Sequence, residues 1–117
     1  MAKARKAQPS DPFVGRWRIT RMDQWEQEFV DAEVEGYVEF GPGGTGEFQF
    51  GYVQGGMHCR PGTRDGVPCV EWTWEGSDEM DPAHGRGWAV IKGGELHGLI
   101  ALHGGDESGF VATKAAR

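Results

Sequence analysis

The strongest constraint on this chain is a succession of short segments with alternating apolar and polar residues, each bounded by a glycine-rich turn. A period of two is typical of strands that bury one face, and frequent turn residues between such segments favour an all-β fold. The 20 glycines, with five Trp, six Phe and two Tyr, suit strands and turns better than helices. We expect eight strands, at residues 13–22, 34–40, 46–54, 57–61, 67–75, 86–92, 95–103 and 109–114.

The turns predict which side chains share a face, because opposed residues of a hairpin point the same way. A turn at Gly55-Gly56 would oppose Tyr52 to Cys59, and a turn at Asp65-Gly66 would oppose Cys59 to Trp72. One face of these three strands is bulky and must be the core: Phe48, Phe50, Tyr52, Met57, Cys59, Val70, Trp72 and Trp74. The other face is polar: Glu47, Gln49, His58, Arg60, Glu71, Thr73 and Glu75.

A turn at Gly93-Gly94 extends the interior and places Trp88 on the outer face, beside Leu99. Either a bulge near Gly87 turns Trp88 inward, or Trp88 lies outside, where it is locally covered or exposed. The other inward residues are Trp17, Ile19, Val38, Phe40, Ala89, Ile91, Leu96, Ile100, Leu102, Phe110 and Ala112. With an even number of hairpin-connected strands, the last can pair antiparallel with the first, which predicts a closed antiparallel up-and-down barrel.

One segment departs from the alternation. Asp23 stands three residues before Glu26, as in a capping box, and Trp25 and Phe29 lie four residues apart, on one side of a helical turn. We therefore expect a short helix near residues 23–31, after the first strand, that covers one end of the barrel.

Charge limits the partners of the chain. Between residues 12 and 113 there are 17 Asp and Glu against 7 Lys and Arg, a net charge of −10, which disfavours nucleic acid. The basic residues 1–11 are typical of a disordered leader or an expression remnant, which leaves residues 12–115 as the single domain. No apolar run reaches transmembrane length and no signal peptide is evident, so we expect a cytoplasmic protein without a membrane contact.

Few residues suggest chemistry. Cys59 should point inward and Cys69 outward, so a disulfide is not expected. The segment 76–85 is interpreted as an acidic loop with Asp78, Glu79, Asp81 and His84, but its spacing matches no calcium loop and we expect neither a metal nor another cofactor. Ser108 lies in a turn signal rather than a nucleophile elbow. A glycosidase-like pair among Glu26, Glu71 and Glu75 stays open, although nothing singles out a pair and enzyme activity is not the expectation.

Gly15-Arg16-Trp17 resembles the Gly-x-Trp motif on the first strand of lipocalins and related calycins. The resemblance implies an up-and-down barrel that binds small apolar molecules, although the chain lacks the usual C-terminal helix of that superfamily. The segments Asp78-Glu79-Met80-Asp81-Pro82 and Gly85-Arg86-Gly87-Trp88 are similar to small bacterial proteins without a known activity.

Two functions follow from these patterns. The first is non-enzymatic binding of a small apolar or aromatic molecule at the helix-covered mouth, with Trp25, Phe29, Tyr52, Trp72 and Trp74 as contacts. The bulky interior could instead be a solid aromatic core. The second function is docking of a basic protein on an acidic outer wall, lined by Glu35, Glu39, Glu47, Glu71 and Glu75. We expect a monomer or a weak homodimer.

Overall fold

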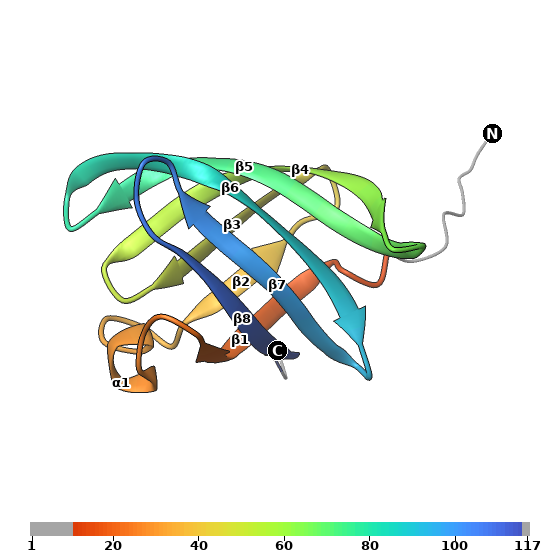
Figure 1. Cartoon of the computed structure of the whole chain (residues 1–117), viewed down its shortest axis with the longest axis horizontal. Helices are drawn as coiled ribbons and strands as arrows, with labels where there is room; N and C mark the ends of the chain where they lie inside the picture. Colours follow the sequence, from red (N-terminus) through yellow and green to blue (C-terminus); the bar gives the residue numbers. More distant parts are fainter. Residues whose placement is uncertain (1–10, 116–117) are drawn as a thin grey trace.

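Eight antiparallel strands close into one barrel in the computed structural model, which describes residues 11–115 (Figure 1). The elements are β1 (Gly15–Met22), α1 (Gln27–Val30), β2 (Tyr37–Phe40), β3 (Thr45–Phe50), β4 (Val53–Arg64), β5 (Val67–Asp78), β6 (Asp81–Lys92), β7 (Glu95–Leu102) and β8 (Glu107–Lys114). The all-β class, the up-and-down order and the short helix after the first strand are therefore confirmed. The predicted leader lies almost wholly in residues 1–10, outside the described residues.

Closure joins the first and last strands. β1 pairs with β8 from Trp17↔Lys114 to Met22↔Phe110, with a register shift between Ile19 and Arg21. Every strand therefore has a neighbour on both sides over part of its length, while residues 59–64 of β4 pair with β5 alone.

The predicted turn at Gly55-Gly56 is wrong. Phe50 pairs with Val53, so the chain turns at Gly51 and Tyr52, and Gly51 takes a φ of +58° that glycine adopts readily. Gly55 instead lies within β4, where a Cβ atom would come within 2.5 Å of the Trp74 ring. Glycine is needed there for packing, and Tyr52 belongs to a turn rather than to the inward face.

The predicted acidic loop 76–85 is also wrong. β5 continues to Asp78 and β6 begins at Asp81, with only Glu79 and Met80 between them, both at positive φ. The paired residues run from Gly76↔Ala83 to Asp78↔Asp81. Acidic residues are depleted from strands but tolerated at a solvent-facing hairpin end, so composition concealed the strands here.

The other predicted hairpins are confirmed. Arg64 pairs with Val67 around Asp65-Gly66, and Lys92 pairs with Glu95 around Gly93-Gly94. β5 and β6 keep one continuous register past Gly87, so no bulge turns Trp88 inward. Trp88 pairs with Leu99, points outward and is half-buried, which is the locally covered alternative.

Bulky side chains fill the interior. All predicted inward residues other than Tyr52 are buried or pack against the buried core. Aromatic rings contact one another in two series along the barrel. The longer series runs from the helix inward: Tyr52, Phe29, Trp25, Phe50, Phe48 and Trp74. The shorter series starts at the other end: Phe13, Phe40 and Trp72.

The capping box that the sequence predicts does not form. α1 begins at Gln27 with Glu26 as its N-cap and no side-chain cap bond. The backbone N–H of Asp23 is instead directed to β8, where the buried Ser108 accepts bonds from Asp23 and Gln24, each at 3.1 Å. Ser108 is thus a strand residue that anchors the chain leaving β1, not a turn residue.

Candidate functional site

The barrel has two different ends (Figure 1). At the helix end, α1 and the turn at Gly51-Tyr52 lie over the mouth. At the entry end, the chain enters through residues 11–13, and the β4–β5 hairpin projects beyond the other strands. The predicted ligand contacts are distributed between these ends and the interior.

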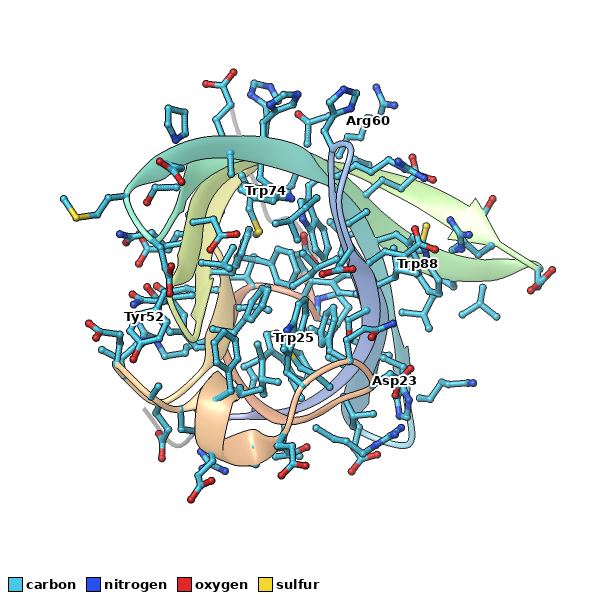
Figure 2. The ribbon with its side chains drawn as sticks, turned by 60° about the vertical axis from the view of Figure 1, so that its left-hand side comes forward. Asp23, Trp25, Tyr52, Arg60, Trp74 and Trp88 are labelled. Carbon is cyan, nitrogen blue, oxygen red and sulfur yellow. The ribbon has the colours of Figure 1, made fainter. Side chains whose placement is uncertain are left out.

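Rings seal the helix end. Trp25 stacks on Phe29 at 6.0 Å and lies 5.0 Å from Phe50, while Phe29 meets Tyr52 edge-on at 5.9 Å. Figure 2 shows the labelled Trp25 within the ring of strands and Tyr52 at its margin. Trp25, Phe29 and Tyr52, three of the five predicted contacts, therefore lie together. Much of their surface, however, is packed against neighbouring rings.

The two remaining predicted contacts lie deeper and apart. Trp74 packs edge-on against Phe48 at 5.0 Å, and its indole N–H donates to the carbonyl of Ala101 at 3.1 Å. Trp72 packs against Phe40 at 5.5 Å, in the shorter ring series. Its indole nitrogen is buried and has no hydrogen-bond partner among the described residues. Trp72 thus has an unsatisfied buried donor, which lies against Gly87 of β6.

A recess of about 510 Å³ opens at the entry end. It is built from four segments that are far apart in sequence, and its lining is mostly apolar: Pro12, Phe13, Phe40, Pro42, Cys59, Pro61, Pro68 and Val70. The entering chain is fixed in place, because the Trp17 indole N–H donates to the Phe13 carbonyl at 2.9 Å and the Phe13 N–H donates to Asp11 at 2.9 Å. The sequence patterns did not predict this concavity.

Both cysteines are free thiols, as predicted. Cys59 pairs with Trp72 and lines the recess, where burial raises the pKa of its thiol to about 11. Cys69 is buried beside Gly62, and its pKa is also raised, first by burial and then by the Glu71 carboxylate. Raised pKa values keep both thiols protonated at neutral pH, so neither is an activated nucleophile.

Most carboxylates of the predicted acidic wall are paired with a neighbouring side chain. Glu39 meets Arg16 at 2.8 Å, and Glu35 meets Arg18 at 2.9 Å. Glu71 has a weaker ion pair with Arg60 at 3.8 Å. Glu47 accepts a bond of 2.8 Å from Tyr37, whose pKa is raised by burial and by this carboxylate. Of the five predicted acidic residues, only Glu75 has no such partner among the described residues.

Catalytic arrangements find little support in the geometry. Glu71 and Glu75 share the outer face of β5 but are four residues apart, which is about 13 Å along a strand. Glycosidase carboxyl pairs lie closer together, at about 5–9.5 Å. Glu26 is exposed at the start of α1. Within residues 11–115, no three His, Cys, Asp or Glu side chains gather as metal ligands would.

Comparison with known proteins adds no assignment: the chain matches no family model, no curated protein and no solved structure. Across the described residues, no helix has the length and apolar character that crossing a bilayer requires.

Proposed function

We propose that this protein is a non-enzymatic binding module for a small apolar or aromatic molecule, held in the recess at the entry end. The observation that supports the proposal is the recess itself, whose volume of about 510 Å³ falls in the range of small-molecule sites, about 300–1,000 Å³. Its apolar walls would supply affinity and its few polar groups would orient the ligand.

The recess borders the shorter series of rings. Phe13 and Phe40 line it, and Phe40 packs against Trp72 inside the barrel. The Arg60 side chain, which also lines the recess, supplies a donor that a polar atom of a ligand could accept. A ligand that is apolar over most of its surface and carries one acceptor fits this arrangement.

The proposal extends to the fold family. A closed eight-stranded barrel is compatible with a calycin-like fold, and Trp17 of the Gly-x-Trp motif is buried on β1. The Lys114 ammonium lies 4.6 Å from the centre of the Trp17 ring and covers it at the junction of β1 and β8. We therefore propose a calycin-like fold on the basis of this motif and the closed eight-stranded barrel.

A pair of charge substitutions tests the site. Pro61→Glu places a carboxylate at the recess, and Tyr52→Glu places one at the helix end; both positions are exposed, so the variants should fold. The probe is the apolar dye 1-anilinonaphthalene-8-sulfonate, followed by its fluorescence, with dodecanoate as a competitor. We expect saturable binding that Pro61→Glu weakens about tenfold or more, and that Tyr52→Glu leaves unchanged.

Two outcomes would count against this placement. If Tyr52→Glu abolishes dye binding while Pro61→Glu does not, the ligand occupies the helix-covered mouth. If the native protein shows no saturable dye binding and no competition by dodecanoate, the protein is not a binder of apolar molecules.

A further inference from the structure

The outer face of β4, β5 and β6 contains a groove of about 310 Å³, which shares only Arg60 with the recess. Two rows of side chains line it, with one residue from each strand: His58, Thr73 and Arg86 in one row, and Arg60, Glu71 and Trp88 in the next. The rest of the lining is Arg64, from the end of β4, together with Trp72 and Gly87. Figure 2 shows Arg60 and Trp88 outside the ring of strands.

The groove is basic in an acidic protein. The chain has a net charge of −6, yet three arginines and one glutamate line this groove. Glu71 is 3.8 Å from Arg60, a long ion pair. Arg64 and Arg86 have no carboxylate within 4.0 Å in the described part of the chain, so their charges are not locally neutralised.

Arg64 is held in place by an aromatic ring. Its Cζ lies 3.9 Å from the centre of the Trp88 ring, a cation–π contact that favours this position of the guanidinium. A guanidinium has five N–H donors, so an arginine over a ring can still donate to another partner. A guanidinium that is already oriented loses less entropy when it binds an anion.

A second arginine over an aromatic ring, Arg16, shows how Arg64 differs from an arginine that is also paired with a carboxylate. The Cζ of Arg16 lies 3.8 Å from the centre of the Tyr37 ring, much like Arg64 over Trp88. Arg16, however, donates its Nε–H to the Glu39 carboxylate at 2.8 Å, and this ion pair offsets its charge. Arg64 differs because it has no carboxylate partner in the described part of the chain, so its charge is left for a ligand.

We propose that this groove binds a small organic phosphate, a molecule with a phosphate or diphosphate group. Guanidinium forks match phosphate oxygens, and several arginines around one groove suit a group with more than one negative charge better than a single carboxylate. Thr73, between His58 and Arg86, adds a hydroxyl donor. A nucleic acid is a poorer occupant, because the acidic body would repel a long phosphate backbone.

Titrations of the ¹⁵N-labelled protein test the proposal, with amide and arginine Nε–H chemical shifts as the readout. The probes are pyrophosphate, phenyl phosphate, inorganic phosphate and benzoate, all at one ionic strength set by NaCl. We expect saturable shifts at Thr73 and at the groove arginines, with phenyl phosphate bound about tenfold tighter than benzoate. Phenyl phosphate should also bind more tightly than inorganic phosphate, because Trp88 adds an aromatic contact.

Matched arginine variants locate the binding. Arg64→Gln and Arg86→Gln should each weaken pyrophosphate binding about tenfold, the cost of one charge-assisted contact. Arg64→Lys, which keeps the charge but not the planar fork, should weaken it less. Arg16→Gln is the control, since it removes a stacked arginine outside the groove. Arg60 is left unchanged because it also lines the recess.

Several results would overturn the proposal. Shifts that NaCl alone reproduces, or an equal loss in Arg16→Gln, would show unspecific attraction of anions. Equal affinity for phenyl phosphate and inorganic phosphate would indicate a free oxyanion rather than an organic phosphate. Tighter binding of a single-stranded oligonucleotide than of pyrophosphate would indicate a polymer.

Discussion

The helix end and the entry end of the barrel use the same kind of residue for different results. At the helix end, six rings contact one another in an unbroken series from Tyr52 to Trp74. At the entry end, the series has three rings, from Phe13 to Trp72, and a recess of about 510 Å³ opens beside it. Aromatic content alone therefore does not mark a binding site.

The difference comes from what covers each end. α1 and the Gly51-Tyr52 turn bring rings onto the mouth, and the Gly51 N–H donates to the Val30 carbonyl at 2.8 Å. The entry end is covered by the turn at residues 11–14 and by prolines, which have compact and rigid side chains. Rings stacked on rings fill space, whereas a frame of backbone and proline leaves it open.

The largest expected difference between the ends is in stability. Phe50→Ala removes a fully buried ring of the longer series and should cost about 3–5 kcal/mol, because a closed cavity remains. Phe13→Ala removes a ring at the rim of an open recess and should cost about 1.5–3 kcal/mol, the transfer free energy alone. Urea denaturation of both variants measures the free energies of unfolding. Equal losses would mean that the entry end is packed as tightly as the helix end.

Glycine substitutions should give a smaller difference in unfolding free energy between the two ends. In Gly51→Ala the new Cβ would lie 2.3 Å from the Phe29 ring, at a φ of +58°. We expect a loss of about 1–2 kcal/mol from the left-handed backbone and about 1–3 kcal/mol from overpacking. Gly66→Ala, in the β4–β5 turn, has a φ of +76° but open space around its Cβ, so only the backbone cost remains.

Urea denaturation again provides the measurement. If Gly51→Ala and Gly66→Ala lose the same free energy, the Phe29 ring moves aside at no cost, and the helix end is softer than its ring contacts suggest.

The sequence predicted the barrel because each strand carries its own alternation and most turns carry their own signal. Asp65-Gly66 and Gly93-Gly94 occupy left-handed turn positions, and their registers were correct. Gly55-Gly56 shows the same dipeptide inside a strand, where glycine makes room for the Trp74 ring. Turning and close packing both require glycine, so sequence alone could not separate them.

The candidate sites were harder to predict because their residues come together only when the strands close into a barrel. The recess joins residues near positions 12, 42, 60 and 69, whose proximity depends on how far β4 and β5 project beyond the other strands. The clustering of prolines at 12, 42, 61 and 68 was the available signal, but each also suits a strand end. Likewise, Arg64 reaches Trp88 diagonally across β5, a contact that pairwise registers do not reveal.

The smallest expected effect concerns the Cys59 thiol, which reports on the entry end. In a Cys69→Ser background, the iodoacetamide reaction of folded protein should reach its half-maximal rate near the raised pKa of about 11. The unfolded chain in guanidinium chloride should reach it at about pH 8.5, because the thiolate is the nucleophile. Since burial favours the protonated thiol, the stability that this pKa shift contributes is complete below the unfolded value and is lost as the pH rises toward 11.

Alkylation of Cys59 also shows at which end of the barrel a ligand binds. Saturating 1-anilinonaphthalene-8-sulfonate should slow the alkylation of Cys59 if it fills the recess, because Cys59 lines that wall. Pro61→Glu should remove this protection, whereas Tyr52→Glu should not. A bound dye that leaves the alkylation rate unchanged would place the ligand away from the entry end, and a half-maximal rate near pH 8.5 in the folded protein would show that Cys59 is in contact with water.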